Sequence, residues 1–237
     1  MIAGVRPAVA ATVVFLAAAA VLVMEILTAR LMAPYLGVSL ETYTGIIGTV
    51  LAGIAAGSWL GGRAADLFSA RLILGPILIL GGFLTLVSPT LVNLLGPQME
   101  GGGLAAIVVL AAFTVFLPAL VLSAVTPIVV KLQLTDLEAT GTIVGRLSAF
   151  ATAGALVGTF GTGFLLVGWA PTRVIVAGTG IVLMVLGVLV AGRLRRGIGA
   201  TTICALTVLA AGAGAAALAV TGPVSYTHLT LPTIYSV

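Results

Sequence analysis

Residues 8–34 read AVAATVVFLAAAAVLVMEILTARLMAP, an apolar run in which Glu25 and Arg30 are the only ionisable side chains. A helix needs about 20 mostly apolar residues to cross a bilayer. Similar runs follow at about 42–62, 71–95, 104–130, 147–169, 173–192 and 198–221. The sequence therefore predicts an all-α fold, a polytopic bundle of about seven transmembrane helices. The length of the first run favours a membrane helix over a cleaved signal peptide.

The composition of the whole chain supports a membrane protein. Of 237 residues, 61% are hydrophobic and only 7% are charged, whereas soluble domains carry roughly 25% charged residues. The net charge of +4 does not indicate a nucleic-acid partner, because the cations form no basic stripe with interleaved aromatic residues. One cysteine (Cys204) and one histidine (His228) exclude a disulfide framework and a Cys- or His-rich metal site. The expected partner of most of the surface is the lipid bilayer, with no metal site.

The cationic residues predict the orientation of the bundle. If the N-terminus is cytoplasmic, the loops divide the cations eight to two. The inner set is Arg6, Arg63, Arg71, Lys131, Arg146, Arg193, Arg195 and Arg196, and the outer set is Arg30 and Arg173. Cytoplasmic loops of membrane proteins carry an excess of Lys and Arg. We therefore expect a multi-pass protein of the cell (inner) membrane with its N-terminus in the cytoplasm.

Glycines recur every four residues in two of the predicted spans. They are Gly53, Gly57 and Gly61 in the second span and Gly154 and Gly158 in the fifth. Small residues at this spacing let the backbones of membrane helices approach closely. We interpret both sets as helix-packing faces; a substrate path lined by backbone is the alternative.

Three segments of the chain together resemble a known family. They are residues 25–39, EILTARLMAPYLGVS; residues 53–66, GIAAGSWLGGRAAD; and residues 148–164, SAFATAGALVGTFGTGF. Over about residues 20–175 the sequence resembles the membrane domain of fused transporter-like/spermidine synthase proteins. The resemblance implies a membrane module followed by a soluble aminopropyltransferase-like domain that binds decarboxylated S-adenosylmethionine and a polyamine.

None of that soluble domain is encoded in the 237 residues. We find no Gly-rich loop after a strand and no acidic residue placed for a ribose. No catalytic residue of the family can therefore be assigned here, and no cofactor is expected for this stretch of chain. The resemblance implies that residues 1–222 anchor a missing enzyme domain and supply it with substrate.

The segment from Gly57 to Arg71 favours a second interpretation. Arg63, Asp66 and Arg71 resemble the charged loop that closes the cytoplasmic gate of major-facilitator transporters, although a plain charged loop would obey the same charge rule. The alternative function is a small transporter or half-transporter of the major-facilitator type, working as a dimer of six- or seven-helix units.

A faint internal repeat agrees with this alternative. Gly57 precedes Arg71 by 14 residues, and Gly158 precedes Arg173 by 15. Helices 1–3 and 4–6 would then form a 3+3 inverted repeat, plus one further helix, an arrangement common in transporters. Pro118 and Pro127 are expected to bend or end the fourth helix, because proline removes a helix hydrogen bond.

Four polar residues near the first loop are candidates for an intramembrane site: Glu25, Arg30, Glu41 and Tyr43. An ionisable side chain inside a span usually pairs or faces the bundle interior. One interpretation is a structural pair that holds the first helix to the Glu41 region. The other is a polar pocket for a polyamine or another small cation.

The last residues of the sequence, 223–237, differ in character from everything before them. Residues 224–233 read VSYTHLTLPT, which is similar to the translation of a transposon-end sequencing adapter. Such a tail is excluded from reasoning about the fold. We therefore expect the natural protein to continue differently after about residue 222.

Overall fold

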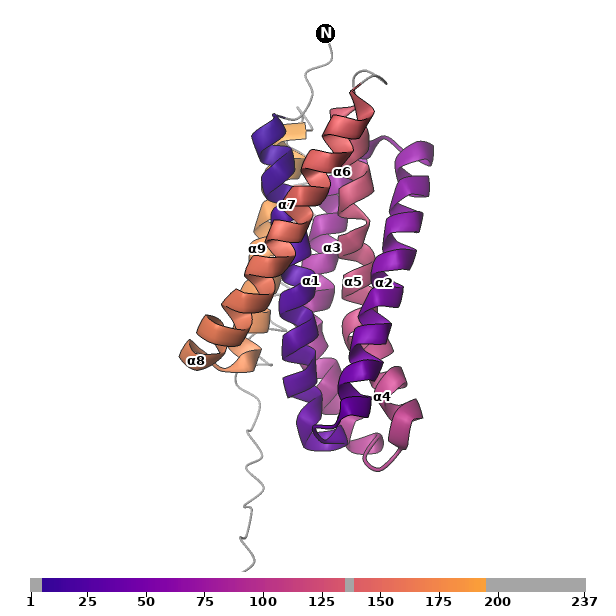
Figure 1. Cartoon of the computed structure of the whole chain (residues 1–237), viewed down its shortest axis with the longest axis vertical. Coiled ribbons are helices and arrows are strands. Elements are labelled where there is room, and N and C mark those ends of the chain that lie inside the picture. The colour runs from indigo at the N-terminus through magenta and orange to yellow at the C-terminus, as the bar shows by residue number, and fades with distance from the viewer. Residues whose placement is uncertain (1–5, 135–138, 195–237) are drawn as a thin grey trace, which may run out of the picture.

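A computed structural model describes residues 6–134 and 139–194, which form a bundle of helices without a strand in these ranges (Figure 1). The first three spans are α1 (Pro7–Leu36), α2 (Leu40–Leu67) and α3 (Ala70–Leu95), and α3 is followed by the short helix η1 (Gly96–Gln98). The fourth consists of α4 (Gly103–Ala111), the π-helix η2 (Ala112–Phe116), α5 (Leu117–Ser123) and α6 (Val125–Gln133). The fifth consists of α7 (Thr140–Phe160), the π-helix η3 (Gly161–Leu166) and α8 (Val167–Trp169), and the sixth is α9 (Thr172–Leu194).

Within the described residues, six segments are long and apolar enough to cross a membrane, and they coincide with the first six predicted spans. The chain is a multi-pass membrane protein with the predicted all-α fold. The observed helices extend several residues beyond the predicted ends, because polar residues such as Arg63 and Asp66 continue the helix beyond the apolar run. The predicted seventh span, 198–221, and the tail lie outside the described residues.

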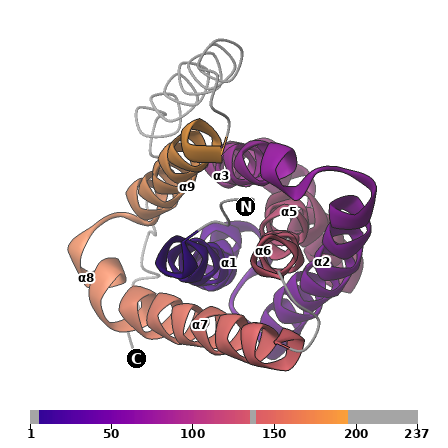
Figure 2. The same cartoon turned by 90° about the horizontal axis from the view of Figure 1, so that it is seen from above.

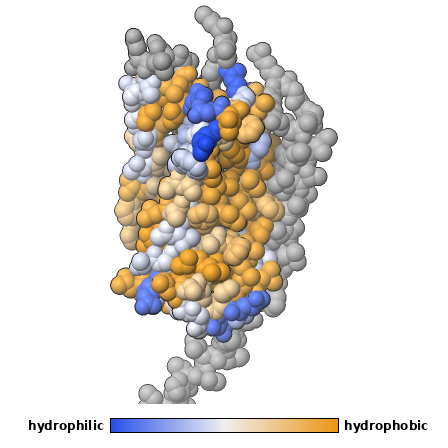
Figure 3. Space-filling view, turned by 90° about the vertical axis from the view of Figure 1, so that its right-hand side faces the viewer, coloured by the Kyte–Doolittle hydropathy of each residue, from blue (hydrophilic) through white to orange (hydrophobic). Residues whose placement is uncertain are grey.

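Polar side chains gather at the two ends of the bundle and leave an apolar band between them, as the face in Figure 3 shows. We name the end at which α1 begins the Arg6 end and the opposite one the Gly37 end. Many side chains in the band are large, apolar and exposed, among them Leu51, Phe160 and Leu189. In a membrane these side chains meet lipid rather than water.

The joint between α1 and α2 explains part of the motif in residues 25–39. Gly37 ends α1 with a φ of 72°, a backbone conformation that side chains with a Cβ disfavour. Ser39 then caps α2, and its hydroxyl accepts a hydrogen bond of 3.1 Å from the backbone N–H of Thr42. The joint therefore returns the chain sharply, so that α2 runs antiparallel to α1.

Seen from above, α1 and the α5–α6 segment lie at the centre of the bundle, and the other spans surround them (Figure 2). α2 packs along α4, α5 and α6, α7 packs along α1, and α3 packs along α9. The first and fourth spans run in opposite directions through the bundle. The same is true of the second and fifth, and of the third and sixth.

The two glycine faces make the same contact with two different central helices. A Cβ added at Gly57 would lie 2.0 Å from the carbonyl oxygen of Leu120, and one added at Gly158 would lie 2.5 Å from that of Ala19. The two glycines are 101 positions apart, and so are their two partners. Gly53 and Gly154 repeat this relation, with the carbonyl oxygens of Phe116 and Phe15.

The contact between α3 and α9 is also made by glycines. Gly82 lies against Gly180, and Gly75 lies against Gly187, so that a Cβ on any of the four would meet backbone within 3.0 Å. Helices 1–3 and 4–6 therefore pack as two copies of one unit, inserted in opposite directions, with α3 and α9 in contact between them.

The regular α-helix of the fourth span is broken twice, by the π-helix η2 just before Pro118 and by a turn at Ala124. Pro118 has no N–H to bond the carbonyl oxygen of Thr114, four residues earlier. The hydroxyl of Ser88 in α3 donates to that oxygen instead, at 2.8 Å. The second break falls at Ala124, between α5 and α6, three residues before Pro127. Both prolines thus act as predicted, and one of the carbonyls they leave free is bonded by a neighbouring helix.

Candidate functional site

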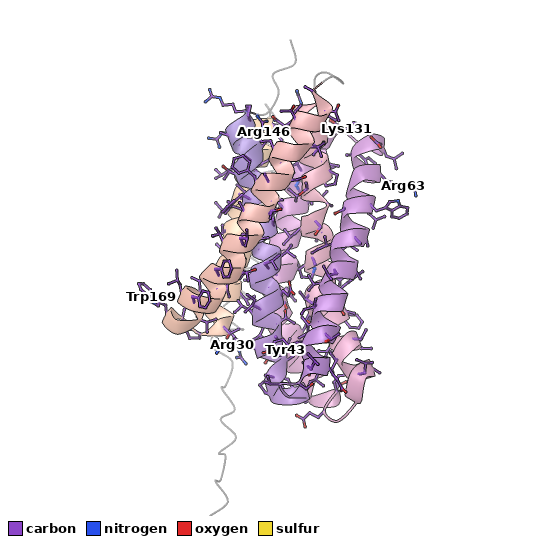
Figure 4. All side chains as sticks on the ribbon, in the orientation of Figure 1. Arg30, Tyr43, Arg63, Lys131, Arg146 and Trp169 are labelled. Atoms are coloured by element: carbon purple, nitrogen blue, oxygen red, sulfur yellow. The ribbon has the colours of Figure 1, made fainter. Side chains whose placement is uncertain are left out.

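A cavity of about 430 Å³ opens near the Gly37 end, between α1, α2 and the η3–α8 segment. We name it the Gly37-end cavity. Its walls come from both three-helix units, and they are Glu25, Ile26, Ala29, Arg30, Tyr43, Ile46, Ile47, Gly163 and Val167. Its volume falls within the range of small-molecule sites, roughly 300–1,000 Å³. In Figure 4, Arg30 and Tyr43 lie beside each other at this end of the bundle, the same end as Trp169.

Two opposite charges face this cavity. Glu25 is half-buried and lies about 17 Å before the end of α1, at 1.5 Å of rise per residue. Arg30 follows one and a half turns later and is exposed. Side chains five residues apart on a helix point about 140° away from each other, so Glu25 and Arg30 line opposite edges of the face that α1 presents to the cavity. No ion pair joins them, and within the described residues Arg30 has no hydrogen-bond or ion-pair partner.

Three of the four residues predicted for a polar intramembrane site therefore lie around one cavity. Glu41, the fourth, is exposed in the first turn of α2 and does not line it. A carboxylate in the first turn of a helix interacts favourably with the partial positive charge of the helix N-terminus. The structure thus places Glu41 at the α2 terminus and brings Glu25, Arg30 and Tyr43 together.

The cavity lies where the glycine packing of the second unit stops. In α2 the third glycine, Gly61, continues the face, and a Cβ there would lie 2.5 Å from Cα of Ala124. The position 101 residues later is Thr162, which is buried within η3 and whose hydroxyl has no partner among the described residues. A threonine cannot make the backbone approach that Gly61 makes. The fifth span widens into a π-helix there, and such bulges are frequent at functional sites.

The Arg6 end differs from the Gly37 end because an ion pair joins α2 and α6, the helices that correspond to the fifth span and α1 around the cavity. Lys131 at the end of α6 donates to the carboxylate of Asp66 at the end of α2. Both side chains are largely exposed, so the pair orients the two helix ends more than it stabilises the fold. Of the other two residues predicted for a gate, Arg63 lies with its guanidinium carbon 4.8 Å from the ring centre of Trp59, and Arg71 is half-buried in the first turn of α3.

Known proteins give no match to the chain. No family model matches it, and no curated protein or solved structure is significantly similar to it. The resemblance to spermidine synthase-like membrane domains therefore stays a prediction. The geometry of the described residues has to carry the functional argument.

Sequence reasoning missed Lys131, Thr162 and Val167, because each is unremarkable in its own segment. Their roles follow from the repeat: shifting the sequence by 101 positions aligns Arg30 with Lys131, Asp66 with Val167 and Gly61 with Thr162. The spacing of Gly57 and Gly158 contains that signal. Only the contacts of the two glycines identify the shift that matters.

A second cavity, of about 400 Å³, lies between α1, α9 and the residues Leu166 and Ala170 on either side of α8. Aliphatic side chains such as Leu16, Val23 and Val182 line it, and the hydroxyl of Thr179 at its edge donates to the carbonyl oxygen of Ile175. Such a surface fits acyl chains and offers no group for recognising a polar ligand. Within the described ranges, no three His, Cys, Asp or Glu side chains gather in a way that could hold a metal ion.

Proposed function

We propose that the chain is the membrane module of a spermidine synthase-like protein, and that it binds a small polar solute as well as anchoring the enzyme. The observation that carries the proposal is the position of the Gly37-end cavity. It lies between the two inverted units and is lined by Glu25 and Arg30 within the span region. Transporters of inverted-repeat construction bind their substrates at the interface between the repeats. Ionisable side chains inside a span face the bundle interior or a cavity and commonly mark substrate or ion pathways.

A transporter of the major-facilitator type is the second candidate, and the difference between the two ends of the bundle favours it. The Arg6 end is joined by the Lys131–Asp66 pair, whereas the Gly37 end holds an open cavity at the equivalent place. If the two units exchange their conformations, the ion pair breaks and the cavity closes. Such an exchange would alternate the access to a central site, with one chain or a dimer as the working unit.

The orientation belongs to the same proposal. Among the described residues, the helix bounds place Arg6, Arg63, Arg71, Lys131, Arg146 and Arg193 at the Arg6 end, and Arg30 and Arg173 at the Gly37 end. The excess of cations supports an Arg6 end in the cytoplasm and a Gly37-end cavity on the outer side of the inner membrane.

Single cysteines in a Cys204→Ser background test the orientation. An impermeant thiol reagent added to intact cells should label Glu100→Cys and leave Ser69→Cys unlabelled. Labelling of Ser69→Cys alone would reverse the orientation.

Binding and uptake separate the two candidate functions. The purified chain should gain thermal stability from at least one member of a panel of polyamines, amino acids and small amines, because a ligand that binds only the folded state stabilises it. Glu25→Gln should abolish that gain, and Glu100→Gln, an exposed carboxylate outside the cavity, should leave it intact. Uptake of the same compound into proteoliposomes would favour the transporter; binding without uptake would favour a module that presents solute to an enzyme. If no compound of the panel raised the thermal stability, the solute-binding proposal would fail and only the anchoring role would remain.

A further inference from the structure

Resting on the proposed solute-binding function, we propose that the Gly37-end cavity binds a small zwitterion. Its ammonium group would lie at Glu25, its acid group at Arg30, and its aliphatic body between them. This ligand class differs from the polycation that the resemblance to spermidine synthases suggests.

Arg30 lacks the carboxylate that its counterpart has. The shift of 101 positions that relates the glycine contacts pairs Arg30 with Lys131, and counted onwards along the sequence, past η3, it pairs Val167 with Asp66. Lys131 donates to Asp66, whereas Arg30 and Val167 line the cavity together. The cavity wall around Arg30 thus offers the aliphatic Val167, whereas Lys131 has the anion Asp66 beside it. A guanidinium in this position is suited to an acid group that comes from the ligand, because its planar donors match carboxylate and phosphate oxygens.

Glu25 supplies the opposite charge and is equally free to bind a ligand. The residue 101 positions after Glu25 is the uncharged Thr126 in the fourth span. The Arg6 end therefore has no carboxylate that corresponds to Glu25. Glu25 and Arg30 point about 140° apart on α1 and do not pair with each other. A carboxylate and a guanidinium held apart in one cavity can both be neutralised by a ligand that carries one charge of each sign.

The rest of the wall fits an aliphatic body with few polar groups. Ile26, Ile46, Ile47 and Val167 form apolar sides, and Gly163 has nothing within 4 Å of a Cβ built on it. Tyr43 adds one hydroxyl at the rim. A polyamine would meet Glu25 with one ammonium and bring another towards Arg30, where like charges repel. The wall therefore favours a zwitterion over a diamine of the same length.

The ammonium and acid groups can come from a free amino-acid-type solute or from a zwitterionic lipid headgroup such as phosphatidylethanolamine. Both would be recognised by the same two side chains. The probes below separate these sources, because the soluble ones are measured in detergent without added lipid.

The test measures the affinity of the purified chain for four probes of one length: 6-aminohexanoate, hexylamine, hexanoate and 1,6-diaminohexane. Wild-type protein should bind 6-aminohexanoate at least tenfold more tightly than the other three, since each charge-assisted contact contributes on the order of tenfold. Arg30→Gln should remove the preference of 6-aminohexanoate over hexylamine. Repeating the measurement in nanodiscs of phosphatidylglycerol, with and without phosphatidylethanolamine, shows whether the lipid headgroup competes for the site.

Val167→Asp is the sharpest variant, because it gives Arg30 the carboxylate that Asp66 gives Lys131. It should weaken binding of 6-aminohexanoate at least tenfold more than Val167→Asn does, and both variants are compared at equal thermal stability. Equal losses in the two variants would overturn the proposal. So would tighter binding of 1,6-diaminohexane than of 6-aminohexanoate, or an unchanged preference in Arg30→Gln; in these cases a solute site survives but takes a different ligand. If none of these probes binds while another compound of the wider panel does, only the zwitterion proposal fails.

Discussion

The second and fifth spans present the same glycine face to a central helix, but only the second continues it to the end. In α2 the face consists of Gly53, Gly57 and Gly61, and all three contact the fourth span. In the fifth span Gly154 and Gly158 contact α1 in the same way, and the third place is taken by Thr162 in a π-helix. The cavity thus opens beside the place where the fifth span has Thr162 instead of a third glycine.

The largest expected effect lies in the shared part of the two faces. Gly57→Leu and Gly154→Leu should each destabilise the bundle by about 3 kcal/mol or more, because the new side chain meets backbone rather than a gap. A Cβ alone would lie 2.0 Å from the carbonyl oxygen of Leu120 at Gly57 and 2.1 Å from that of Phe15 at Gly154. Thermal unfolding in detergent measures the loss.

Gly62→Leu is the control, since nothing lies within 4 Å of a Cβ at Gly62. It should unfold close to the wild-type temperature. If Gly154→Leu behaved like this control while Gly57→Leu did not, the two faces would not be copies of one packing arrangement.

The next effect concerns the residue at which the faces differ. Thr162→Gly restores the third glycine and should let the fifth span approach α1, which narrows the Gly37-end cavity. The rate at which a thiol reagent labels Ile47→Cys, on the cavity wall, should then fall by roughly tenfold, a change of about 1.4 kcal/mol in accessibility. Thr152→Gly, on the exposed side of α7, serves as control. An unchanged labelling rate in Thr162→Gly would show that η3 opens the cavity for another reason.

A smaller effect is expected in the central helices, which also differ between the two units. α1 is regular through positions 17 and 26, whereas the fourth span has Pro118 and Pro127 at the positions 101 residues later. Ser88→Ala should cost about 1–2 kcal/mol, because the buried carbonyl oxygen of Thr114 loses its hydrogen bond. Ser58→Ala, at an exposed position of α2, is the matched control for thermal unfolding. Equal stability of the two variants would mean that another group satisfies the carbonyl.

The smallest effect is expected at the ion pair of the Arg6 end. Lys131 and Asp66 are 48% and 71% exposed, and exposed pairs contribute about 0–1 kcal/mol. Asp66→Asn and Lys131→Gln should therefore change the unfolding free energy little, with a coupling below about 1 kcal/mol in a double-mutant cycle. A coupling above about 2 kcal/mol would show that the pair is a structural clamp and would weaken its interpretation as one side of an opening and closing site.

Much of the fold could be predicted because it depends on residue type alone. Apolar runs predict six of the spans, and the glycines at every fourth place predict the packing faces of the second and fifth without knowledge of the partners, whereas the glycine contact of α3 with α9 was not predicted. The candidate site could be predicted only in part. Glu25, Arg30 and Tyr43 were visible as polar residues near a loop, whereas Glu41 has the same character and lies elsewhere.

The sequence by itself determined that the chain crosses a membrane several times, because sixteen ionisable side chains among 237 residues cannot form a surface that faces water. It also indicated two faces at which backbones approach closely, because glycines at every fourth place leave room for a neighbouring carbonyl. The tertiary structure decided which helix fills each glycine face, and therefore which residues are counterparts. Arg30 lies beside Val167 and Lys131 beside Asp66 because of contacts between residues far apart in the chain. A local sequence pattern cannot predict such contacts.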